Sequence, residues 1–66
     1  MKTLGFIGGG NMARSIVGGL LATGYPSDRI WVSDPSQAQL KLLQELGKIN
    51  AVTENAQIVS ECDCIL

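Results

Sequence analysis

The chain has 66 residues, a formal net charge of −1 and 45% hydrophobic residues, so its composition is that of a globular protein and its length allows one small domain at most. The near balance of charge, without a basic cluster, disfavours nucleic acid or an anionic membrane surface as a partner. No apolar run approaches the roughly 20 residues that span a bilayer, and two cysteines without histidine disfavour a disulfide framework or a zinc site, so a cytoplasmic protein without a bound metal is expected.

The first expected element is the apolar run 4–7, which predicts a parallel strand covered on both faces. It leads through glycines into a helix predicted at residues 11–23. Gly8, Gly10 and Ala13 fit the G-x-G-x-x-[G/A] pattern of a dinucleotide-binding turn. In that pattern Gly8 permits the tight turn, Gly10 lets the backbone approach a diphosphate, and Ala13 lets the helix pack near the strand.

The predicted first helix carries its apolar residues in adjacent pairs four positions apart, as expected for a helix that packs on a sheet. These residues are Met12, Ala13, Ile16, Val17, Leu20 and Leu21. Gly18 and Gly19 each cost roughly 1 kcal/mol relative to alanine in a helix interior, so close approach to a neighbouring element is the expected compensation. Gly24 stands where a C-terminal cap belongs.

A second strand is predicted at residues 30–33, which are rich in β-forming side chains. A second helix should begin at Pro35 or Ser36 and end at Leu46, before Gly47. Its expected buried face consists of leucines: Leu40, Leu43 and Leu46, with Leu42 beside them.

The remaining residues predict a very short strand at 50–53, a short helix at 55–61 and a strand that begins at 63–66. Alternation of strands and helices predicts an α/β fold with a doubly wound, Rossmann-like parallel sheet, in which the fourth strand lies beside the first. Because complete folds of this kind need roughly twice this length, we expect a fragment that is truncated at the start of its fourth strand. Such a fragment should be marginally stable or prone to aggregation on its own.

The glycine turn is the main functional signal. Backbone N–H groups from Gly9 to Met12 are expected to face a diphosphate, helped by the positive end of the helix dipole. The Asn11 side chain could cap the first turn or contact the ligand directly. The competing interpretation is a purely structural turn in an α/β domain.

Asp34 follows the predicted second strand and permits two interpretations. Its carboxylate could accept hydrogen bonds from both adenosine ribose hydroxyls, which favours NAD and repels the 2′-phosphate of NADP. Alternatively, with Pro35 after it, Asp34 caps the second helix, although Ser36 and Gln39 offer a competing capping box. No arginine directly follows this strand, so hydroxyls of Ser33 and Ser36 would have to bind a 2′-phosphate.

Residues 6–20 resemble the N-terminus of pyrroline-5-carboxylate reductases, where the family shows F-I-G-x-G-N-M-x-x-A-I-x-x-G-L. The resemblance continues through residues 53–55 and into 61–66, and so covers essentially the whole chain. Two departures are Ser15 and Cys62, since alanine is usual at the first position and common at the second.

The resemblance implies an oxidoreductase of proline biosynthesis that reduces 1-pyrroline-5-carboxylate to proline, with NADP(H) favoured as cofactor and NAD(H) possible. It implies that the substrate-binding and dimer-forming domain lies outside this chain, so residues 1–66 alone hold no catalytic residue and are inactive. The cofactor contacts that it implies are Ile7, Gly8, Gly9, Gly10, Asn11, Met12, Ser33, Asp34, Ser36 and Asn55.

Two other functions remain open from the sequence. One is a stand-alone nucleotide-binding or regulatory module without chemistry of its own. The other is the cofactor domain of a β-hydroxyacid-type dehydrogenase, although that group usually carries G-x-x-M-G or G-x-G-x-M in place of Gly-Gly-Gly-Asn-Met.

Overall fold

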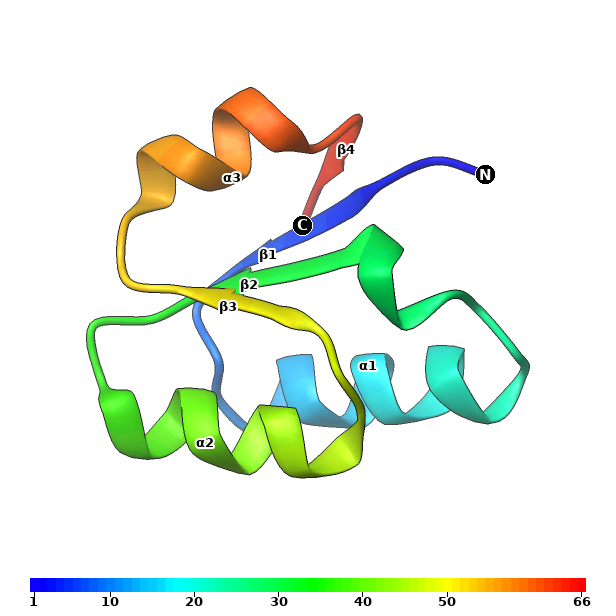
Figure 1. Ribbon diagram of the computed structural model, residues 1–66. Helices are drawn as coiled ribbons and strands as arrows, with labels where there is room; N and C mark the ends of the chain where they lie inside the picture. The colour runs from blue at the N-terminus through cyan, green and yellow to red at the C-terminus, as the bar shows by residue number, and fades with distance from the viewer.

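The computed structural model describes residues 1–66 as one parallel sheet with helices on both faces (Figure 1). The elements in chain order are β1 (Leu4–Ile7), α1 (Asn11–Ala22), η1 (Ser27–Arg29), β2 (Ile30–Ser33), α2 (Gln37–Leu46), β3 (Asn50–Val52), α3 (Asn55–Glu61) and β4 (Cys64–Ile65). The predicted fold class is therefore confirmed. The single 3₁₀ turn η1, which leads into β2, was not predicted.

The strand order is β3-β2-β1-β4, with every pair parallel. As predicted, β4 lies beside β1 on the side away from β2. Figure 1 shows α1 and α2 on one face of the sheet and α3 on the other, which is what right-handed crossovers dictate when the chain first moves outward and then returns past β1. The connection after β1 leads to α1 on one face, and the connection that enters β4 comes from α3 on the other face.

Apolar side chains from the sheet, α1 and α2 form the core. Val17, Ile30, Val32 and Leu43 are completely buried. Their cluster is completed by Phe6, Ala13, Leu40 and Ile49. On the opposite face Ile58 of α3 is also fully buried against the sheet. The strand interiors thus read as continuous apolar runs because both faces are covered.

The predicted buried faces of the two long helices were partly wrong. Met12 is 78% exposed and Ile16 is 40% exposed, although the residues that follow them, Ala13 and Val17, are buried. On α2, Leu42 and Leu46 are also exposed, so only Leu40 and Leu43 reach the core. Each helix covers the narrow sheet with a single stripe, and its flanking apolar residues line open hollows beside that stripe.

The expected close approach at Gly18 and Gly19 was also wrong, because a Cβ built at either position meets no atom within 4 Å. One glycine that the packing does require is Gly5, in the middle of β1. A Cβ there would lie 2.6 Å from Ile58 Cγ2 and 2.7 Å from Cys62 Sγ. Helix α3 therefore packs directly on the backbone of β1.

We expect Gly5→Ala to destabilise the fold by about 1 to 3 kcal/mol, because the new methyl group overpacks the contact with α3. The matched variant Gly18→Ala places its methyl group in open space within a helix and should stabilise by up to about 1 kcal/mol. Chemical denaturation of both variants beside the parent protein measures the difference. Equal effects of the two substitutions would contradict the packing described for Gly5.

Candidate functional site

The turn between β1 and α1 depends on Gly8, whose φ of +99° lies in the region that disfavours residues with a side chain. Its N–H donates to the Ser33 carbonyl at 2.8 Å, which extends the pairing of β1 with β2 by one bond. The predicted tight turn at Gly8 is confirmed. Ala13, one helical turn into α1, is buried against the sheet, as the spacing of small residues predicts.

Backbone N–H groups at the start of α1 form the most polar part of this edge. Those of Gly10, Asn11, Met12 and Ala13 donate no hydrogen bond within the chain, no side chain caps the helix, and its first turn holds no acidic residue. Gly10 itself has ordinary extended angles, and a Cβ there would meet no atom within 4 Å. Four free donors, the positive end of a helix dipole and open space above Gly10 are the properties of an anion-binding site.

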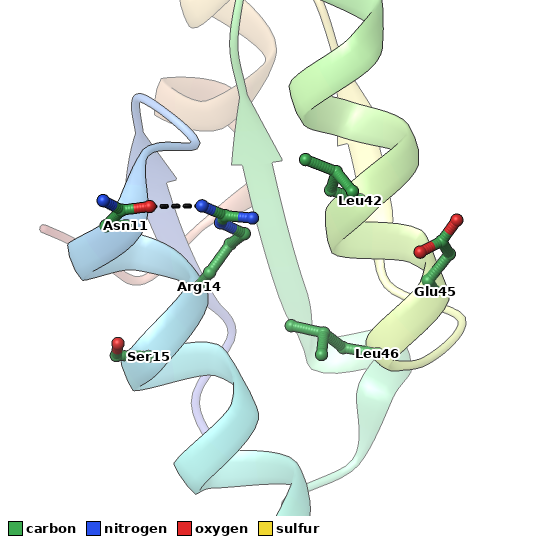
Figure 2. A pocket seen from close by; sticks show the side chains of 6 residues that line it. All are labelled: Asn11, Arg14, Ser15, Leu42, Glu45 and Leu46. Carbon is green, nitrogen blue, oxygen red and sulfur yellow. Dashed lines mark hydrogen bonds between the residues drawn. The ribbon is translucent and has the colours of Figure 1, made fainter.

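Asn11 neither caps α1 nor stands free. Its side-chain oxygen accepts a hydrogen bond from the Arg14 guanidinium, one turn later in the helix (Figure 2). Figure 2 also shows that Leu42 and Leu46 point from α2 toward Arg14, whereas Glu45 points away. These side chains line a hollow of about 450 Å³ between α1 and α2. Arg14 therefore lies in the hollow between α1 and α2, with its guanidinium hydrogen-bonded to Asn11.

The Asp34 carboxylate joins two turns at the carboxyl edge of the sheet. Its Oδ2 accepts the N–H of Gly9 at 2.7 Å, and its Oδ1 accepts the N–H of Ser36 at 2.8 Å. These two backbone hydrogen bonds, Gly9 first, lower the pKa of Asp34 from its ordinary value and outweigh the opposing effect of desolvation. The carboxylate is therefore ionised at neutral pH.

Three further predicted residues meet beside Asp34. Ser36 is the N-cap of α2, because its hydroxyl accepts the N–H of Gln39 at 3.4 Å, so Asp34 does not cap this helix. Ser33 is fully buried, and its hydroxyl donates to Asn55 Oδ1 at 2.6 Å. This bond ties the end of β2 to the first residue of α3.

An apolar groove of about 270 Å³ lies on the other side of the glycine turn, at the carboxyl ends of the neighbouring strands β1 and β4. It is lined by Phe6, Ile7, Gly8, Gly10, Met12, Ala13, Ile16 and Leu66. In open α/β sheets, ligands bind outside the carboxyl ends of the strands where the strand order reverses, which in this sheet is between β1 and β4. Three of the lining residues were not predicted from the sequence, although the expected position of the fourth strand beside the first could have pointed to them: Phe6, Ile16 and Leu66.

The ten predicted contact residues thus all lie at the carboxyl edge of the sheet, and hydrogen bonds connect six of them. Those six are Gly8, Gly9, Ser33, Asp34, Ser36 and Asn55. No group of three or more histidine, cysteine, aspartate or glutamate side chains is placed to hold a metal ion. None of the helices is both long enough and apolar enough to cross a bilayer.

A glycine turn with free N–H donors, a carboxylate at the next strand end and an apolar groove at the switch point define a dinucleotide-binding domain of the Rossmann type. Comparison with known proteins agrees with this class. Residues 3–66 match the model of the family described as "NADP oxidoreductase coenzyme F420-dependent", and the chain belongs to that family.

Individual relatives are more specific. The chain is 44% identical over 66 residues to the pyrroline-5-carboxylate reductase of Vibrio alginolyticus and 56% identical over 54 residues to that of Haemophilus influenzae. These matches cover 98% and 82% of the chain but only 24% and 19% of the relatives. The expected resemblance to pyrroline-5-carboxylate reductases is confirmed, and the chain spans about a quarter or less of the length of these curated relatives.

A solved structure agrees with these sequence matches. The structure of a pyrroline-5-carboxylate reductase from Coxiella burnetii superimposes with a TM-score of 0.91 at 39% identity, covering 97% of this chain and 24% of that one. The chain therefore has the fold of the matching part of that reductase.

The lowered pKa of Asp34 predicts a pH dependence of stability. Because the folded pKa lies below the ordinary value of 3.8, the stabilising effect of the two N–H bonds is complete above that value. It is lost as the pH falls through the lowered pKa. Denaturation of the parent and of Asp34→Asn between pH 2 and 7 should show a weaker acid dependence in the variant. The same loss of stability at acid pH in the parent and in the variant would contradict the assigned hydrogen bonds.

Proposed function

We propose that residues 1–66 form the cofactor-binding part of a pyrroline-5-carboxylate reductase. In that reaction a hydride passes from the nicotinamide cofactor to the C=N carbon of 1-pyrroline-5-carboxylate, and proline is formed. The observation that carries the proposal is the unpaired N–H cluster at the start of α1, in a chain that resembles such reductases over nearly its whole length. Residues that bind the substrate, and those that form an oligomer, belong to the proposed remainder of the enzyme.

The site fits a dinucleotide in three parts. The N–H groups of Gly10, Asn11 and Met12 would bind the diphosphate, since they lack partners and no Cβ stands above Gly10. The adenosine half would lie toward Asp34 and Ser36. The nicotinamide half would lie toward the apolar groove, which excludes water on that side. The cofactor supplies the hydride, and these residues supply binding and orientation.

NADPH is the cofactor we propose, although Asp34 is ionised. Both of its oxygens already accept a backbone N–H, so its charge is partly compensated within the chain. The Ser36 hydroxyl uses its oxygen as an acceptor from Gln39, which leaves its proton free to donate to a 2′-phosphate. The Ser33 hydroxyl already donates to Asn55, and Ser36 is therefore the better candidate of the two serines.

The alternatives left open by the sequence receive less support. The relatives named above are pyrroline-5-carboxylate reductases. No specific feature of the site favours a regulatory module or a β-hydroxyacid-type dehydrogenase. Assembly through a later domain and a cytoplasmic location stay predictions.

Activity can be tested in a chimera in which residues 1–66 replace the matching segment of the Vibrio alginolyticus reductase. We expect Gly10→Val in this chimera to raise the KM for the cofactor by about tenfold or more, because the side chain obstructs the diphosphate. The matched control Gly18→Val, also in open space on α1, should leave that KM unchanged. Steady-state kinetics measures both.

An unchanged cofactor KM in a folded Gly10→Val variant would count against the site. The 66-residue chain on its own should give no cofactor oxidation with 1-pyrroline-5-carboxylate, and turnover from it would show that chemistry lies within these residues.

The cofactor preference has a separate test. In the chimera, Ser36→Ala should weaken NADPH binding by roughly 10- to 100-fold, as expected for the loss of one hydrogen bond to a charged group, and should change NADH binding little. Dissociation constants from nicotinamide fluorescence measure both cofactors. A clear preference of the parent chimera for NADH would show that the negative charge of Asp34 governs selection.

A further inference from the structure

Asp34 is the only side chain that hydrogen-bonds to the backbone of the glycine turn. Its bond to the Gly9 N–H measures 2.7 Å and its bond to the Ser36 N–H measures 2.8 Å, both in the range of charge-assisted hydrogen bonds. The two N–H groups lie in different loops. One loop leads into α1 and the other into α2, so a single carboxylate couples both.

Gly9 is held from a second side by packing. It is buried, and a Cβ at this position would lie 2.7 Å from Leu43 Cδ1 and 3.5 Å from Asp34 Oδ2. The peptide at Gly9 is thus wedged between α2 and the carboxylate. The next residue, Gly10, has neither a side-chain contact nor a hydrogen bond through its N–H. Burial of Ala13 and Val17 holds α1 further along, and the Gly9 peptide is the remaining fixed point before the free N–H groups.

We infer that Asp34 is a positioning residue, whose carboxylate fixes the Gly9 peptide and thereby aims the N–H groups of Gly10 to Met12 at the cofactor diphosphate. This inference rests on the proposed function. Because NADH and NADPH share the diphosphate, the effect of Asp34 is common to both cofactors. Asp34 supports binding of either one, and it does not choose between them.

A selective role makes the opposite prediction. If Asp34 acted on the ribose, its neutralisation would weaken NADH binding, because an acceptor for the 2′-hydroxyl is removed. It would strengthen NADPH binding, because a repelling charge is removed. The ratio of the two dissociation constants therefore separates the two roles. A purely structural defect would change neither this ratio nor the affinity of the molecules that are folded. Positioning, in contrast, leaves the ratio unchanged and lowers the affinity of the folded protein for both cofactors.

The experiment compares Asp34→Asn with the parent in the chimera. Asparagine keeps one acceptor oxygen and turns an amide NH₂ toward the other N–H, so one of the two bonds is lost. We expect the dissociation constants of NADH and NADPH to rise together by about tenfold, which corresponds to about 1.4 kcal/mol. The KM for each cofactor should rise in parallel, while kcat at saturating cofactor stays within about twofold.

Asp63→Asn is the matched control. Asp63 Oδ2 also accepts a backbone N–H, that of Thr3 at 2.9 Å, at the opposite edge of the sheet. Its replacement should lower the melting temperature without altering either cofactor constant. If Asp34→Asn does not fold, Asp34→Glu keeps the charge but displaces the oxygens by one methylene. Positioning then predicts weaker binding of both cofactors, and selection by charge predicts the parent's preference and affinity.

The inference is supported if the Asp34 variant binds both cofactors more weakly to the same extent while Asp63→Asn binds them with the parent's affinities. A lower affinity for NADH together with a higher affinity for NADPH overturns the inference. Unchanged affinities for both cofactors in a folded variant overturn it as well. Failure of the parent chimera to bind either cofactor would instead overturn the proposed function, and the positioning role with it.

Discussion

The left-handed backbone at Gly8 is the constraint on which the arrangement of this edge depends. Strand β1 lies between two parallel neighbours, β2 and β4. The chain that follows β1 must therefore turn sharply out of the plane of the sheet to place α1 on its face. The positive φ of Gly8 makes that turn, and its N–H still pairs with the Ser33 carbonyl. Because of this turn, Gly9 lies beside the end of β2, where its N–H donates to Asp34, and the free N–H groups at the start of α1 follow directly in the chain.

Much of this architecture could be predicted from the sequence, because it depends on local chemistry. Apolar runs placed β1 and β2 at the observed residues, and the spacing of Gly8, Gly10 and Ala13 located the turn. The fourth strand was correctly expected beside the first, since doubly wound sheets allow few strand orders. All of these inferences use nearest neighbours in the chain or general rules of topology.

Other features depend on contacts between distant residues and could not be predicted. The periodicity of α1 does not show that Met12 faces a groove, because the width of the sheet beneath the helix decides this. The partners of Asp34 could not be foreseen either, since Gly9 precedes it by 25 positions. Capping rules correctly offered Ser36 as the start of α2, but they gave no indication that the freed carboxylate would bind the glycine turn. Likewise, Gly5 is explained only by α3, which packs on it from far along the chain.

We propose that the start of α1 binds the diphosphate of a nicotinamide dinucleotide. A crystal structure of the chimera with bound NADPH would show directly where the diphosphate lies. We expect diphosphate oxygens within hydrogen-bond distance of the N–H groups of Gly10, Asn11 and Met12, with the Gly9 N–H still donating to Asp34. A diphosphate bound away from this turn, with those N–H groups left without a ligand, would contradict it.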